Sequence, residues 1–248
     1  MKFSANLGFL WADLPLPDAI RAADQAGFDA VEMHWPFDSD QAAVRRALCE
    51  TGLPLLGLNT FRGGPGFNGL AALPDKKAEC RVAIDQAFDW AQALGANNVH
   101  VMAGFASGTD ARATFLSNLQ YASDLGKQRN IGVLIEPLNA FDAPGYYLSE
   151  QRHAVELITE LDRPNVRLMF DCYHVGRTEG DICGTFDQVR HWVGHVQFAS
   201  VPNRSEPDSS LVPVLRHIER SGYTGAFGAE YKPAAGIRQG LSWLELFQ

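Results

Sequence analysis

The sequence predicts a (β/α)8 barrel, a closed ring of eight parallel strands in which each strand is followed by a helix. Two observations predict it: short β-rich runs alternate with stretches of helical apolar spacing, and this alternation recurs eight times. The chain has 248 residues, an ordinary length for such a barrel, and no low-complexity tract marks a linker. We therefore expect residues 1–248 to form a single domain.

Eight runs rich in β-branched and other apolar residues are the expected strands. They lie at Phe3–Phe9, Ala30–His34, Leu55–Asn59, Asn98–Met102, Gly132–Glu136, Val166–Asp171, His195–Ala199 and Ala226–Glu230. Because strands and helices alternate, the strands should run parallel with right-handed crossovers, and eight such units can close into a ring.

The stretches between these runs have apolar residues at a spacing near 3.6, which indicates helices packed against a sheet. The expected helices lie near 17–26, 39–51, 75–94, 110–129, 149–161, 185–192 and 208–221, and a tail near 235–247 is a candidate for the eighth. Several should end at a glycine, such as Gly52 and Gly95, because glycine readily adopts the left-handed conformation that follows a helix.

An open, doubly wound sheet is the structural alternative. Such a sheet normally has a glycine-rich, phosphate-binding turn after its first strand. The corresponding segment here, Leu10–Pro15, contains no glycine. The closed barrel is therefore favoured.

The composition limits the expected partners and location. The formal net charge is -8, and an acidic protein repels phosphate backbones and anionic lipids, so neither nucleic acid nor a membrane surface is expected as a partner. The N-terminus lacks a signal-peptide pattern, and no apolar run approaches the roughly 18 residues that span a bilayer. None of the four cysteines forms a close pair, which is typical of reduced thiols. A cytoplasmic protein is expected.

Three carboxylates and one amide lie at or near the ends of four successive expected strands: Glu136, Asp171, Gln197 and Glu230. Barrel active sites lie at this end, and an acid there is costly to bury unless it is paired or bound to a metal. One such acid can simply cap the next helix, but three at equivalent positions are hard to explain in that way. Oxygen-only ligands favour Mg²⁺ or Mn²⁺ over Zn²⁺, so we predict a divalent-metal site. His195 shares a strand face with Gln197 and either reaches a ligand or packs in the core.

Three residues in the expected mouth loops are candidates for substrate binding. His174 follows Asp171 by three positions, where it either faces the mouth or lies on the surface. Arg204 can hold a substrate carboxylate through two hydrogen bonds, or it can form an ion pair with Glu206 or Asp208. Lys232 either contacts an anionic substrate or is solvated.

At these residues the chain resembles the hydroxypyruvate isomerase family, within the wider xylose isomerase-like barrels. The matching strings, in family order, are Leu58–Thr60, His100–Gly104, Ile135–Asn139, Pro144–Leu148, Asp171–His174, His195–Gln197, Glu206–Asp208 and Glu230–Pro233. They span nearly the whole chain. Family members commonly read R-H-E-P after the seventh strand, whereas here the order is Arg204, Ser205, Glu206 and Pro207.

The resemblance implies a (β/α)8 fold and an aldose–ketose isomerisation. It implies that Glu136 and Glu230 are both the acid–base pair and metal ligands, and that Asp171 and Gln197 are further metal ligands. Proton transfer through an enediolate is the expected mechanism, with a hydride shift as the alternative.

The resemblance also implies a small hydroxy- or keto-acid substrate, either hydroxypyruvate or a 2-oxo-tetronate. In related sugar epimerases the residues matching His174 and Arg204 hold the substrate. The alternative functions are a sugar epimerase, an inosose dehydratase-like lyase, a metal-dependent endonuclease and a non-catalytic binding protein. Aromatic residues after the first three expected strands either line the mouth or contact a second subunit in a homo-oligomer; they are Trp11, Trp35, Phe37, Phe61 and Phe67.

Overall fold

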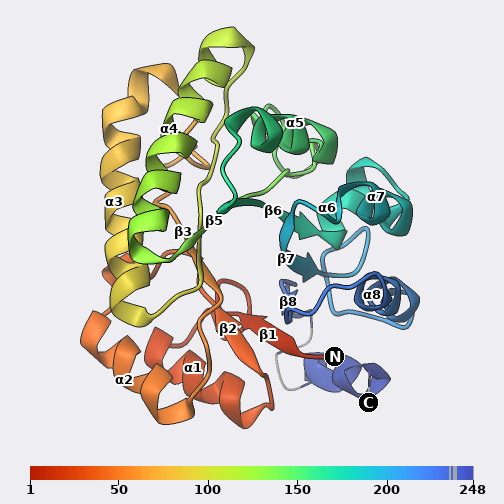
Figure 1. The fold of residues 1–248 in the computed structure, drawn as a ribbon. Helices are drawn as coiled ribbons and strands as arrows, with labels where there is room; N and C mark the ends of the chain where they lie inside the picture. The colour runs from red at the N-terminus through yellow and green to blue at the C-terminus, as the bar shows by residue number, and fades with distance from the viewer. Residues whose placement is uncertain (235, 237–238, 248) are drawn as a thin grey trace.

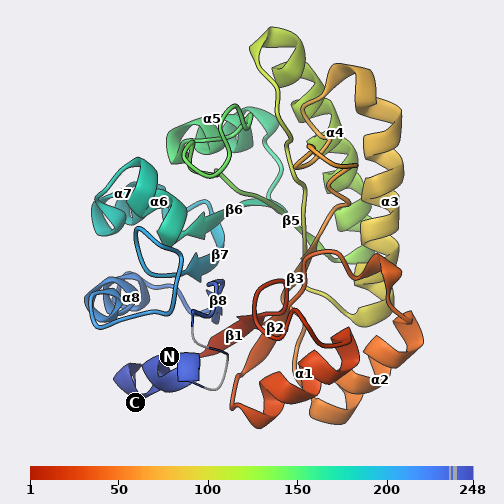
Figure 2. The same ribbon diagram turned by 180° about the vertical axis from the view of Figure 1, so that it is seen from behind.

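The computed structural model describes residues 1–234, 236 and 239–247. Over these residues a central ring of parallel strands is surrounded by helices, as the two opposite views show (Figure 1, Figure 2). The strands are β1 (Phe3–Asn6), β2 (Ala30–Glu32), β3 (Gly57–Asn59), β4 (Asn98–His100), β5 (Gly132–Ile135), β6 (Val166–Asp171), β7 (Val193–Phe198) and β8 (Phe227–Ala229).

The outer layer consists of α-helices that connect successive strands, with three short 3-10 segments. The α-helices are α1 (Leu16–Gln25), α2 (Gln41–Thr51), α3 (Lys77–Leu94), α4 (Gly108–Arg129), α5 (Gln151–Leu161), α6 (Cys172–Thr178), α7 (Ile182–Val189) and α8 (Leu211–Arg220). The 3-10 segments are η1 (Pro36–Asp38), η2 (Pro74–Lys76) and η3 (Gln239–Phe247). The two longest helices, α3 and α4, pack side by side on one flank of the barrel (Figure 1).

Backbone hydrogen bonds close the ring. The strands pair in the order β2-β1-β8-β7-β6-β5-β4-β3, which leaves β2 and β3 at the two ends. These ends are joined because the Leu56 amide donates to the Val31 carbonyl at 2.9 Å and the Met33 amide donates to the Gly57 carbonyl at 3.0 Å. The predicted closed barrel is confirmed, and the open sheet is excluded.

The strands are mostly shorter than expected at their carboxyl ends. Strand β1 ends at Asn6 because the amides of Phe9 and Leu10 both donate to the Asn6 carbonyl, which turns the chain out of the sheet. The sequence places the residues after Asp171 in a loop or in the first turn of a helix, and the structure shows a helix of seven residues, α6. The tail forms a 3-10 helix from Gln239 rather than an α-helix, and residues 235, 237 and 238 of the expected range lie outside the described residues.

Aromatic side chains pack η3 against the outside of the barrel, where Trp243 contacts Phe3 and Phe198. Trp243 of η3 meets Phe3 of β1 edge-on, with ring centroids 5.0 Å apart, which brings the two termini together (Figure 2). Gly52 and Gly95 end α2 and α3 with a φ of 72° each, as their positions predict. No helix among the described residues is long and apolar enough to cross a membrane.

Candidate metal and active site

The four residues predicted as metal ligands all lie at the carboxyl ends of their strands. Glu136 and Glu230 directly follow β5 and β8, whereas Asp171 ends β6 and Gln197 lies in β7. The register of β6 and β7 pairs Asp171 with Gln197. All four side chains are buried, so each of their polar groups needs a partner.

Three buried acceptor oxygens in this group have no hydrogen-bond partner. They are Glu136 Oε1, Asp171 Oδ2 and Gln197 Oε1. Asp171 does cap α6, but it does so with Oδ1, which accepts from the Tyr173 amide at 2.8 Å, and this leaves Oδ2 without a hydrogen bond. Unsatisfied buried acceptors from adjacent strands are costly unless a cation meets them. These residues therefore fit a hard divalent cation, which prefers carboxylate and amide oxygens.

His174 lies against the same carboxylates. One ligand atom each from Glu136, Asp171 and His174 lies within 4.8 Å of the others. Nε2 of His174 is 3.8 Å from Glu136 Oε1 and 3.7 Å from Asp171 Oδ2. By distance alone, His174 could be a metal ligand beside Glu136 and Asp171.

The hydrogen bonds of His174 argue against that role. Its Nδ1 atom accepts from the Asn139 backbone amide at 3.0 Å and lies 2.7 Å from the side-chain nitrogen of Asn139. The Asn139 amide orientation is fixed because Oδ1 accepts from the amides of Phe141 and Asp142. Burial lowers the pKa of His174 well below 6.5, so its ring is neutral at physiological pH. A neutral ring whose Nδ1 accepts must carry its proton on Nε2, so this atom donates toward the cavity.

Arg204 lies inside the same group. Its guanidinium is hydrogen-bonded to the Glu230 carboxylate, and Nη2 is 3.5 Å from Asp171 Oδ2. The sequence-based alternative of an ion pair with Glu206 or Asp208 is wrong, because neither acid pairs with Arg204. Cation–π contacts with the rings of Phe9 and Tyr173, at 4.8 Å and 5.1 Å, hold the guanidinium from its sides.

The site has an excess of buried negative charge. Burial raises the pKa of Glu230 to about 8, against the opposing effect of Arg204. Burial, together with the charges of Glu230 and Asp171, raises the pKa of Glu136 well above 4.5. Two further histidines add no positive charge near neutral pH, because burial lowers the pKa of His34 to about 4 and that of His100 to about 3. A divalent cation would relieve this imbalance.

Lys232 and His195, which the sequence also identifies as candidates, supply none of the three oxygens that lack a hydrogen-bond partner. Lys232 is exposed, and only its backbone is tied to the site, through an amide that donates to the Arg204 carbonyl at 2.7 Å. The substrate role of Lys232 stays a prediction. His195 is buried in the barrel interior with Nε2 3.1 Å from Glu32 Oε1, which fits the core interpretation.

Sequence reasoning missed Glu32 and Asn6. Both are buried, and Asn6 donates from Nδ2 to Glu230 Oε2 at 2.8 Å. The missed signal was a charged residue inside an otherwise apolar strand, since Glu32 follows Ala30 and Val31 directly. Such a residue is rarely buried without a specific partner.

A cavity of about 200 Å³ opens at this end of the barrel. Its lining includes Glu136, His174, Arg204 and Glu230. Phe9 and Trp35 form aromatic walls, and eight further residues complete the lining. Of the aromatics expected at the mouth, Trp35 therefore does line it, whereas Phe61 and Phe67 are exposed. The size of the cavity suits a small molecule rather than a polymer.

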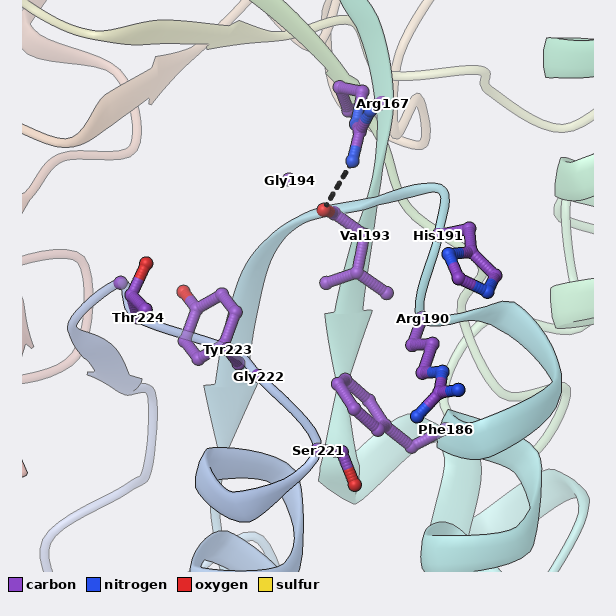
Figure 3. A pocket seen from close by; sticks show the side chains of 11 residues that line it. Arg167, Phe186, Arg190, His191, Val193, Gly194, Ser221, Gly222, Tyr223 and Thr224 are labelled. Carbon is purple, nitrogen blue, oxygen red and sulfur yellow. Dashed lines mark hydrogen bonds between the residues drawn. The ribbon is translucent and has the colours of Figure 1, made fainter.

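A larger cavity of about 690 Å³ lies at the opposite ends of the strands (Figure 3). There Arg167 donates to the Val193 carbonyl at 3.0 Å, and Tyr223 lies across from them (Figure 3). No carboxylate is among the described residues that line this cavity. It offers neither metal ligands nor an acid–base pair, so the smaller cavity is the candidate active site.

Comparison with known proteins gives consistent matches. The sequence model of the xylose isomerase-like TIM barrel family matches residues 20–247. The chain is 37% identical to a 2-oxo-tetronate isomerase of Cupriavidus necator, over 98% of this chain and 97% of the relative. It is 33% identical to the hydroxypyruvate isomerase of Escherichia coli over the full length of both. A crystal structure described as an AP endonuclease, family 2, from Brucella melitensis superposes with a TM-score of 0.95 at 34% identity, covering 100% of this chain and 99% of that one.

Proposed function

This chain belongs to the xylose isomerase-like TIM barrel family and is similar over its whole length to hydroxypyruvate and 2-oxo-tetronate isomerases, and we propose that it isomerises a small sugar acid with the help of a divalent metal. The observation that carries the proposal is that Glu136 and Glu230, two buried carboxyls with raised pKa, line one small cavity. A raised pKa brings a carboxyl closer to the strength that general acid–base catalysis needs near neutral pH.

The proposed reaction moves one proton between neighbouring carbons. In hydroxypyruvate, the proton leaves C3 of the hydroxymethyl group, the electron pair forms the C2–C3 double bond of an enediolate, and the C2 oxygen takes the negative charge. C2 then takes up a proton, and the proton of the C3 hydroxyl passes to the C2 oxygen, so that C3 becomes the aldehyde of tartronate semialdehyde. A 2-oxo-tetronate differs by one hydroxymethyl group. In this proposal, one of Glu136 and Glu230 takes the first proton, and the other delivers the second.

The remaining residues bind and orient the substrate. Arg204 would hold the substrate carboxylate, and the Nε2 proton of His174 would donate to a substrate oxygen. Glu136, Asp171, Gln197 and Glu230 would hold the metal, with Mg²⁺ or Mn²⁺ as the favoured ions. When bound, such an ion supplies positive charge beside the oxygen on which negative charge develops.

The direct test is a conversion assay with purified protein. The protein is stripped with EDTA, reloaded with Mg²⁺ or Mn²⁺, and incubated with hydroxypyruvate or with a 2-oxo-tetronate. We expect product by NMR with at least one of these acids, and only after reloading. Absence of conversion of both acids with every divalent ion tried would refute the proposed activity.

A metal-dependent endonuclease is the second candidate, because the Brucella structure is described as an AP endonuclease, family 2. Two observations favour the isomerase: the net charge of -8 opposes binding of a phosphate backbone, and the cavity is small. Incubation with a duplex that contains one abasic site separates the two candidates. Cleavage that depends on Glu136 would favour the nuclease, and an intact duplex would favour the isomerase.

A further inference from the structure

Glu32 is a buried carboxylate that the proposed mechanism does not use. It ends β2 and crosses the barrel interior to reach residues of β1 and β7. One oxygen, Oε1, accepts from the Ser4 hydroxyl and lies 3.1 Å from His195 Nε2. The other, Oε2, accepts from the side-chain nitrogen of Gln197 at 2.7 Å. Only 4% of Glu32 is exposed, so its carboxylate depends on these protein partners rather than on solvent.

The contact with Glu32 determines which way the Gln197 amide faces. An ionised carboxylate can only accept hydrogen bonds, so the amide must present its NH₂ group to Glu32. The reverse orientation would place two oxygens against each other at 2.7 Å, with no proton between them. The Gln197 oxygen must therefore face away from Glu32, and it is one of the three buried acceptors without a partner.

Gly228 of β8 leaves space for this pair. A Cβ atom at Gly228 would lie 2.4 Å from Glu32 Oε1 and 2.9 Å from the Gln197 Cγ atom. The backbone of Gly228 does not have a positive φ, so its conformation does not require glycine. The absent side chain instead allows Glu32 and Gln197 to meet beside β8.

We propose that Glu32 is a positioning residue that turns the Gln197 amide so that its oxygen faces the cation site. The inference rests on the proposed metal-dependent function, because Gln197 matters in this way only if a cation binds there. Residues that orient metal ligands through a hydrogen bond typically contribute about 10- to 100-fold to metal affinity. Glu32 would act through Gln197 and would not touch the substrate or the metal.

The test is a double-mutant cycle on Mn²⁺ affinity, measured by calorimetry on the EDTA-stripped protein. The variants are Glu32→Met, Gln197→Met and the double variant, with Glu156→Met on the surface of α5 as the control for loss of a carboxylate. We expect Glu32→Met to weaken Mn²⁺ binding by about 10- to 100-fold in the wild-type background. In the Gln197→Met background the same change should have little further effect, because the ligand that Glu32 orients is gone.

The outcomes separate the two levels of the proposal. If the wild-type protein does not bind Mn²⁺, the proposed metal-dependent function fails. If the wild type binds and Gln197→Met weakens binding, but Glu32→Met does not, only the positioning role fails. Full additivity of the two losses would also overturn it, since Glu32 would then act independently of Gln197.

Gly228→Ala provides a second variant in case Glu32→Met does not fold. It leaves both side chains chemically intact but crowds them at the distances given above. We expect it to weaken Mn²⁺ binding in the wild-type background and to have little effect in the Gln197→Met background. An unchanged Mn²⁺ affinity in the wild-type background would overturn the inference.

Discussion

The backbone amide of Asn139 donates to Nδ1 of His174 at 3.0 Å, and this bond decides what the histidine can do at the site. Because the ring is neutral and Nδ1 accepts, the proton must be on Nε2. A protonated nitrogen has no lone pair for a metal. His174 is therefore a hydrogen-bond donor to the cavity, although it lies close enough to Glu136 and Asp171 to resemble a ligand.

Replacement of His174 should separate metal binding from turnover. We expect His174→Ala to bind Mn²⁺ as tightly as the wild type while its turnover of the sugar acid falls, because only a donor to the substrate is lost. Calorimetry and steady-state kinetics on one preparation measure both. A large loss of Mn²⁺ affinity would show that Nε2 is a ligand and that the tautomer is the opposite one.

The two glutamates should be separately essential. We expect Glu136→Gln and Glu230→Gln each to lower kcat by about 10²- to 10⁴-fold, because neither amide can accept the proton being moved. Thermal melting should show that both variants remain folded. Near wild-type turnover in either variant would contradict the two-glutamate mechanism.

Arg204 should be selective for substrates that carry a carboxylate. We expect Arg204→Lys to raise the KM for hydroxypyruvate by about tenfold or more, because lysine cannot form the paired hydrogen bonds of a guanidinium. Dihydroxyacetone, which lacks the carboxylate, is the matched substrate and should be little affected. An equal loss with both substrates would mean that Arg204 acts mainly through its ion pair with Glu230.

The stability of the metal-free protein should fall as the pH rises. The pKa of Glu230 is about 8 in the folded protein against an ordinary value of 4.5, mainly because of burial. The folded state therefore holds an extra proton between these values, and its contribution to stability is lost as pH rises through the folded pKa. The slope is at most about 1.4 kcal/mol per pH unit for one proton. Urea unfolding in EDTA between about pH 6 and 9 measures it, and Glu230→Gln should reduce the slope.

The strand-end residues were predictable from the sequence because the carboxyl ends of all the strands of such a barrel lie at one rim. Each apolar run ends at the same rim, so the sequence alone places Glu136, Asp171 and Glu230 together. Helix α6 was not predictable, because its seven residues include Gly176 and show no helical repeat of apolar side chains.

The contacts across the barrel interior could not be predicted in the same way. Glu32 and Gln197 are 165 positions apart, and their meeting depends on strand register and on the space at Gly228. Likewise, nothing in the sequence shows that Asn139 fixes the tautomer of His174, since the two side chains meet only after the loop following β5 folds back over α6. Sequence patterns identify which residues lie at the rim, whereas hydrogen-bond partners determine their roles.

The most direct test of the central claim is isomerisation of hydroxypyruvate in D₂O by the metal-loaded protein, followed by NMR. If Glu136 and Glu230 move the proton through the enediolate, deuterium should appear on C2 of tartronate semialdehyde. The Glu136→Gln and Glu230→Gln proteins should incorporate almost none. Product formed at the normal rate with only the original hydrogen on C2 would contradict the account, because it would show a hydride shift.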